Sequence, residues 1–162
     1  MVLEQLKKKY KSLEVVILIL MVVSLPLFGM VYLYYNSGNM DWGLPALPDW
    51  ADGLLYGAGI GLLVVQYLLF HKKLKDTSQR EELSEKLHEY LEATRVRFLI
   101  LFTTSLISTV GLLFFKSPMY VVIFAVTLLF YSLAKPTPDR IKRLLKLSKE
   151  DAEIVKEIAR PS

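Results

Sequence analysis

Apolar residues in this chain fall into four long blocks with polar segments between them. The blocks are residues 15–35, 51–70, 98–115 and 119–134. A bilayer core about 30 Å thick needs about 20 residues of helix, so each block predicts a membrane span, of which the fourth is short. We expect the fourth span to borrow length from Pro118 and from Lys135, whose long side chain reaches toward lipid headgroups. The predicted fold is all-α: a polytopic four-transmembrane-helix bundle (residues 15–134) with amphipathic cytoplasmic extensions.

The second block carries glycines at helical spacing. Gly53, Gly57 and Gly61 are four residues apart and therefore share one helix face, which we call the glycine face. In a water-soluble helix each glycine costs roughly 1 kcal/mol relative to alanine. In a bilayer, small residues at this spacing let a second backbone approach closely. The glycine face therefore predicts close packing against another helix.

Polar residues of the second and third blocks suggest what that helix is. Gln66 is predicted to hydrogen-bond across helices, with partners among the hydroxyls of the third block, which are Thr103, Thr104, Ser105, Ser108 and Thr109. Thr104, Ser108 and Gly111 lie on one face. We expect the glycine face to meet either this small, hydroxylated face or the glycine face of a second copy. A competing interpretation is a polar transport path along the hydroxyls. No ionisable residue lies deep in a block, which argues against a pump or coupled transporter.

The basic residues set the expected orientation. Of the 20 Lys and Arg residues, 19 fall before the first block, between the second and third, or after the fourth. The positive-inside rule then places both termini and the middle loop in the cytoplasm, in a cytoplasmic (inner) membrane. Acidic residues are interleaved with the basic ones, so the net charge of +4 does not indicate a nucleic-acid partner. Cysteine is absent, which excludes disulfides and thiolate chemistry.

The N-terminal half carries further helix signals. Residues 1–14 combine an apolar stripe with lysines and predict an interfacial helix leading into the first span. Pro26, in the middle of that span, is expected to bend it. Asp49 is expected to cap the second span, with Asp52 in its first turn. The alternative for these aspartates is an outer cation or ligand site that also includes Asp41.

The cytoplasmic loop, residues 71–97, predicts a helix that continues into the third span. Ser78 followed by Glu81 matches a capping box, and nothing up to Phe115 breaks the helix after it. A helix of these 38 residues would be about 57 Å long. The apolar stripe on its first half must be covered by another part of the chain or by a partner.

Residues 116–118 predict a tight turn that joins the third and fourth spans. Residues 135–162, after the fourth span, predict two short amphipathic helices. Thr137 is expected to cap the first helix, with Pro138 at its first position. This helix is basic and suited to an anionic membrane surface. The second helix begins near Ser148, is more acidic, and is expected to contact protein. The candidate contacts for lipid headgroups or a partner are Lys72, Lys73, Lys75, Arg140, Lys142, Arg143 and Lys146.

No catalytic motif is found in the chain. The glycines between Gly57 and Gly61 resemble a dinucleotide loop only superficially, because no strand precedes them. Glu85 and His88 have the spacing of half a di-metal site, but two histidines in the chain do not supply the second half. We expect these side chains to form salt bridges with Lys86 and Arg80, and we expect no enzymatic activity, metal or other cofactor.

Three functions from different classes fit these patterns. The favoured one is a structural, scaffold or accessory subunit that binds membrane lipids and either itself or other membrane subunits, through helix packing and its amphipathic helices. The first alternative is a homo-oligomeric channel or passive carrier, with the hydroxyls of the third span lining the pore. The second alternative is a lipid-binding protein or enzyme at the cytoplasmic interface, which only the basic residues favour.

Overall fold

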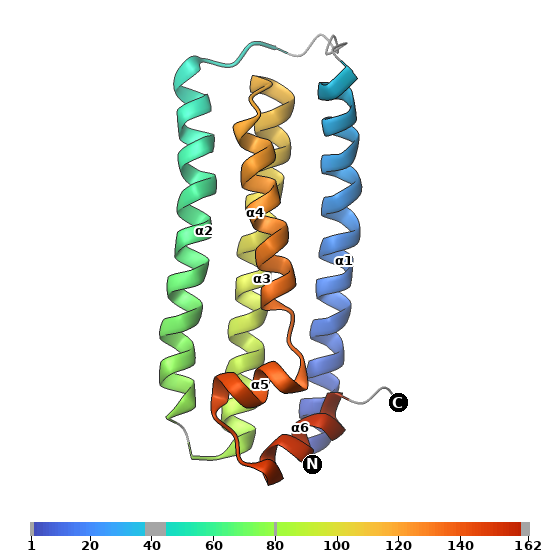
Figure 1. Ribbon diagram of the computed structural model, residues 1–162, viewed down its shortest axis with the longest axis vertical. Coiled ribbons are helices and arrows are strands. Elements are labelled where there is room, and N and C mark those ends of the chain that lie inside the picture. The colour runs from blue at the N-terminus through green and yellow to red at the C-terminus, as the bar shows by residue number, and fades with distance from the viewer. Residues whose placement is uncertain (1, 38–44, 80, 160–162) are drawn as a thin grey trace.

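The computed structural model describes residues 2–37, 45–79 and 81–159, and these residues form helices and short connections only. The helices are α1 (Val2–Ser37), α2 (Asp49–Ser78), α3 (Leu83–Phe115), α4 (Met119–Ala134), α5 (Pro138–Leu145) and α6 (Lys149–Ala159). Helices α1 to α4 run side by side along the long axis, and α5 and α6 lie at one end (Figure 1). The all-α prediction is confirmed for this part of the chain.

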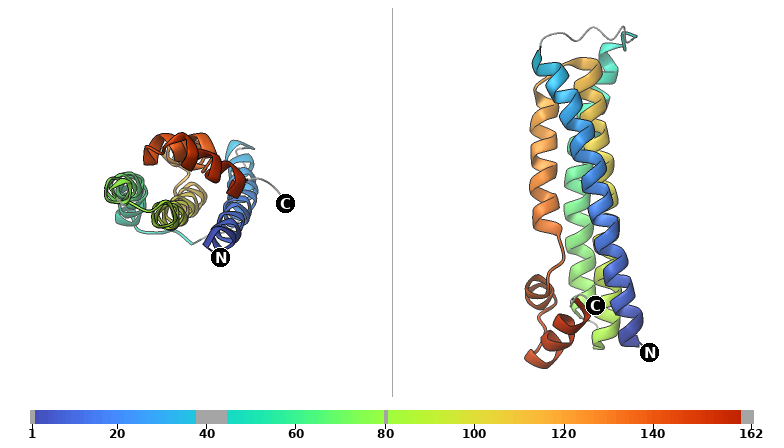
Figure 2. Two further views of the ribbon diagram at one scale, coloured as in Figure 1. Left: turned by 90° about the horizontal axis from the view of Figure 1, so that it is seen from below. Right: turned by 90° about the vertical axis from the view of Figure 1, so that its right-hand side faces the viewer.

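Helix α3 is the centre of the bundle. It packs against α1, α2 and α4, and it lies between α1 and α2 when the molecule is seen from its end (Figure 2). The apolar stripe on its first half is covered by the chain's own helices, since Leu87, Tyr90 and Leu91 are each 2% exposed. The Tyr90 ring meets Phe70 of α2 edge-on, with the ring centres 5.9 Å apart.

Three helices, α1, α2 and α3, are long and apolar enough to cross a membrane, judged by length and composition. Helix α4 has the bounds predicted for the fourth block and only 16 residues. It meets the same criterion only together with α5, from which it is bent by 84°. The tight turn predicted at 116–118 is present, and there Lys116 adopts a left-handed conformation with φ 54°. Its backbone N–H donates to the Leu112 carbonyl and closes α3.

The boundary between α2 and α3 differs from the prediction. Ser78 ends α2 instead of beginning the next helix, and its hydroxyl donates to the Lys75 carbonyl at 3.0 Å. Helix α3 begins only at Leu83. The tertiary contact decides this outcome, because the last turn of α2 buries Thr77, whose hydroxyl donates to Glu89 of α3 at 3.1 Å. A capping box is a local signal and does not register such a contact.

At the end of the bundle that carries α5 and α6, these helices pack against other parts of the chain. The residues expected to form an interfacial helix leading into the first span are, from residue 2 onward, the first turns of α1. Tyr10 there donates to the Pro136 carbonyl at 2.9 Å. In α5, Thr137 caps the helix and Pro138 follows it, as predicted. Its apolar face is not free for lipid, however, because Ile141 and Leu145 are fully buried. Helix α6 packs against α1 and α5, in agreement with the expected protein contact.

Candidate functional site

A buried arginine lies between α2 and α3. Arg97 of α3 is only 7% exposed, and its Nε donates to Oε1 of Gln66 in α2 at 2.8 Å. Gln66 is itself held in place, because its Nε2 donates to the Leu63 carbonyl at 2.9 Å. The guanidinium lies 4.5 Å from the ring centre of Phe70 and 5.8 Å from that of Phe130 in α4. Cation–π and hydrogen-bond contacts therefore fix a positive charge in largely apolar surroundings.

The contact of Gln66 confirms part of the prediction and corrects the rest. Gln66 does bond across helices, but its partner is Arg97 and not a hydroxyl of the third span. Those hydroxyls bond within α3: Thr104 donates to the Ile100 carbonyl and Ser108 to the Thr104 carbonyl, both at 3.0 Å. Serine and threonine in a helix readily reach the carbonyl one turn back, which leaves them without a free donor.

No special role is predicted from the sequence for Arg97, which by position belongs with the basic loop residues. A signal for its burial is nevertheless present in the chain. Arg97 follows Tyr90 by seven residues and precedes Leu101 and Thr104 by four and seven, so all four share one helix face. The other three are buried, so Arg97 lies on the face of α3 that points into the core. A buried cation needs a partner for its charge.

The glycine face of α2 has no partner among the described residues. A Cβ atom added at Gly53, Gly57 or Gly61 would meet nothing within 4 Å. The alternative in which this face packs on the hydroxylated face of the third span is therefore wrong. Helix α2 turns a different side to the bundle, on which Gly59, Leu63, Gln66 and Phe70 are buried. Packing of the glycine face against a second copy stays a prediction.

Gly111 is used within the chain, although against a different partner from the one expected. A Cβ atom at this position would lie 2.1 Å from the ring of Tyr120 in α4. The Tyr120 hydroxyl then reaches α2, where it donates to the Asp52 carboxylate at 2.5 Å. Asp49 does not cap α2, because Pro48 is the N-cap residue and Asp49 the first residue of the helix. Asp41, the third member of the proposed outer cation site, lies outside the described residues.

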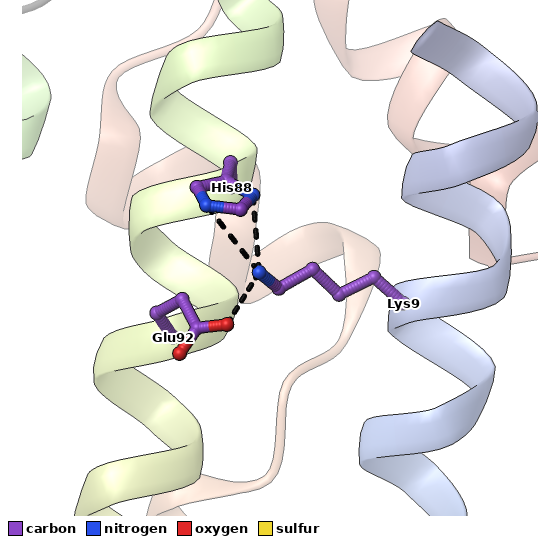
Figure 3. A network of polar contacts seen from close by, with 3 residues as sticks. All are labelled: Lys9, His88 and Glu92. Carbon is purple, nitrogen blue, oxygen red and sulfur yellow. Dashed lines mark hydrogen bonds and ion pairs between the residues drawn. The ribbon is translucent and has the colours of Figure 1, made fainter. Parts of the chain in front are cut away.

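A polar cluster joins α1 to α3. The Lys9 ammonium of α1 forms an ion pair with Glu92 of α3 and lies 3.0 Å from Nδ1 of His88 (Figure 3). His88 precedes Glu92 by one turn of α3. Lys9 is therefore the partner of His88 in place of Lys86, and Arg80 lies outside the described residues. Glu92 lies outside the predicted third span, and the hydrogen bond from Lys9 lowers the pKa of its carboxyl.

Six of the seven candidate contacts for lipid or a partner are exposed, in two groups. Lys72, Lys73 and Lys75 lie on α2 beyond its predicted span, and Lys142, Arg143 and Lys146 lie on or next to α5. The seventh, Arg140, is engaged with α4. Its Nη1 donates to the carbonyls of Ser132 at 2.7 Å and of Lys135 at 2.9 Å, so it closes the end of that helix.

Among residues 2–37, 45–79 and 81–159, no group of three or more His, Asp or Glu side chains is placed to hold a metal ion. In comparisons with protein-family models, curated proteins and solved structures, nothing matches the chain.

Proposed function

We propose that the chain is a small structural subunit of the cytoplasmic membrane that pairs with a second copy of itself along the glycine face of α2. Helices α1 to α4 contain its four spans, and both termini lie in the cytoplasm. The lengths and apolar character of α1, α2 and α3 support membrane insertion, and the distribution of lysine and arginine supports the orientation.

The observation that carries this proposal is the open space at three glycines. Within the bundle, Gly111 has to be glycine because the ring of Tyr120 occupies the space of a side chain there. Gly59 also has a close neighbour, since a Cβ atom added to it would lie 3.5 Å from the side chain of Ile123. Gly53, Gly57 and Gly61 have no such neighbour, although glycine is the least favourable helix residue after proline. Close approach of a further helix gives these three glycines a purpose.

A second copy is the occupant that requires the fewest additional assumptions. Two identical faces related by a twofold axis are complementary to each other, which makes a dimer the simplest closed assembly. Below the glycines, the same side of α2 continues with Val64 and Leu68, which are 51% and 60% exposed. This face contains no charged residue between Gly53 and Leu68, so its burial leaves no charge unpaired.

A pore along the hydroxyls of the third span is less well supported. Thr104, Ser105 and Ser108 are fully buried inside one copy, where each donates to a carbonyl of its own helix. A pore between copies needs such groups on an exposed face. Helices α5 and α6 also pack most of their apolar side chains against the chain itself, so they offer little apolar surface for association.

The proposal is tested by native mass spectrometry of protein extracted gently from its membrane. The expected result is a dimer in the wild type and a monomer when Gly57 and Gly61 are both replaced by isoleucine. Gly29→Ile is the matched control, because a Cβ atom on that glycine of α1 also meets nothing within 4 Å. Unchanged stoichiometry in the double variant would refute the glycine-face dimer.

Two other outcomes replace the second copy with a different assembly. Other chains in stoichiometric amount make the protein an accessory subunit of a mixed complex. A ring of identical copies that passes ions in liposomes of the pure protein favours the channel. Orientation is tested separately with tags: a tag at either terminus is expected to be protected in intact cells, and one inserted at Ser37 is expected to be accessible from outside.

A further inference from the structure

The Arg97 guanidinium carries donors that the chain does not use. A guanidinium has five N–H groups, and Nε–H is the one bonded to a side chain, that of Gln66. No carboxylate among the described residues pairs with Arg97, although the side chain is more than nine-tenths buried. A buried cation without an anion is costly, and its free donors favour an anion that comes from outside the chain.

A cavity of about 380 Å³ opens beside this arginine, between α2 and α3. Arg97 and Gln66 form part of its wall, and Lys73 contributes a second cation. The remainder is mostly apolar, with Leu69, Val96 and Ile100 among the lining side chains. Glu92 also borders the cavity, but its charge is paired with Lys9. The pocket thus joins two cations to an apolar wall.

The position of the cavity relative to the predicted spans indicates where its ligand comes from. Arg97 immediately precedes the third span, and Lys73 lies three residues beyond the second, so both stand at the expected level of the lipid headgroups. Leu69 and Val96 are about half exposed, at 51% and 49%, and therefore face the surrounding lipid. A phosphodiester has two free oxygens and one negative charge, which suits the two parallel donors of a guanidinium.

We propose that this cavity binds one anionic phospholipid, with its phosphate on Arg97 and Lys73 and an acyl chain along Leu69, Val96 and Ile100. Binding is independent of the glycine face, which lies on a different side of α2. The lipid neutralises the buried guanidinium and fills the groove between α2 and α3, so it joins the two helices as a structural component.

The test measures lipid retained in native mass spectra and the thermal shift produced by added lipid, with the full chain in a neutral detergent. We expect phosphatidylglycerol to stay bound and to raise the melting temperature. Phosphatidylcholine with the same acyl chains has the same phosphodiester but also a choline cation, which Arg97 and Lys73 repel, so it should bind more weakly and produce a smaller shift. Arg97→Gln should abolish both effects. Lys73→Gln, which changes an exposed residue and leaves the fold intact, should weaken binding roughly tenfold, the loss of one charge-assisted contact.

Matched controls separate the site from general basicity. Arg95→Gln removes an exposed arginine two residues away, and Lys72→Gln removes the neighbour of Lys73; neither side chain lines the cavity, and both variants should bind as the wild type does. Ala93→Phe keeps both cations and fills the cavity, so it should also abolish binding if the protein remains folded.

Four outcomes would overturn the proposal. The first is an equal rise in melting temperature with the two phospholipids, and the second is wild-type binding by both Lys73→Gln and Ala93→Phe. The third is an equal rise with palmitate, which would mean that the site binds a carboxylate head group. The fourth is an equal rise with inorganic phosphate, which would mean that the acyl chain plays no role.

Discussion

The aromatic ring of Tyr120 occupies the place that a side chain at position 111 would take. A Cβ atom on Gly111 would be 2.1 Å from that ring, and the ring is fixed because its hydroxyl donates to Asp52. Three helices meet in this one contact: α3 supplies the glycine, α4 the tyrosine and α2 the aspartate. Gly111 is therefore required by contacts inside a single chain, in contrast to the glycine face of α2.

Replacement of Gly111 by alanine is expected to destabilise the protein by about 1–3 kcal/mol, the usual cost of overpacking a core. Gly29→Ala is the matched control, because open space surrounds that position and alanine is favoured over glycine in a helix. The measurement is the thermal midpoint of each purified variant in detergent. Equal midpoints for Gly111→Ala and the wild type would show that the two helices are not in this close contact.

Tyr10→Phe is expected to lower the stability by about 1 kcal/mol, because it leaves the buried Pro136 carbonyl without its donor. For a chain of this length the corresponding loss is roughly 2–4 °C in melting temperature. Tyr32→Phe removes a hydroxyl from an exposed tyrosine of the same helix and serves as the control. A larger loss in the control than in Tyr10→Phe would contradict the proposed link between α1 and the segment that joins α4 to α5.

Gln66→Leu is expected to cost about 1–3 kcal/mol, since it removes the only side-chain acceptor that Arg97 has among the described residues. Arg97→Met gives the second single variant, and the double variant completes a thermodynamic cycle. The two losses should not add, and the coupling energy should be about 0.5–3 kcal/mol. Additive losses would mean that the hydrogen bond between the two side chains contributes nothing to stability.

The ion pair between Lys9 and Glu92 predicts a dependence on acid pH. Its effect is to lower the pKa of Glu92 in the folded protein, so the stabilisation is complete above the ordinary glutamate pKa of about 4.3 and is lost as the pH falls further. Glu92→Gln should therefore melt below the wild type at pH 7, and this difference should shrink as the pH falls below the ordinary glutamate pKa. The Glu92 side chain is 45% exposed, so salt should reduce the difference at pH 7.

The control for this pH profile is Glu81→Gln, which changes an exposed carboxylate. It should follow the wild type at every pH. A gap between Glu92→Gln and the wild type that stays constant down to pH 3 would assign the effect to packing instead of charge.

Local signals were sufficient where one stretch of sequence determines the structure. The bounds of α4, the turn at 116–118 and the capping of α5 by Thr137 depend on neighbouring residues, and all three are present as predicted. The prediction that Ser78 begins the next helix is wrong, because the local residues fit either the end of one helix or the start of another. The contact of Thr77 with Glu89 determines that α2 ends there. That contact joins two helices and is not visible in either alone.

The candidate site was harder to predict for the same reason. The polar character of Gln66 was visible in the sequence, but its partner depends on how α2 and α3 are rotated relative to one another. Arg97 is adjacent to a predicted span, and only the rotation of α3 decides whether such a residue faces water or the bundle. The glycine spacing places three residues on one face of α2, but spacing does not tell whether that face turns inward or outward.

The last helix of the chain rests on the first, and this has a consequence for synthesis. Helix α6 packs against α1, so this end of the bundle is completed only after α6 has been made. At about 5–20 residues per second, the first turns of α1 wait on the order of 10 seconds for that partner. During this interval the part of α1 that α6 will cover lacks its last partner.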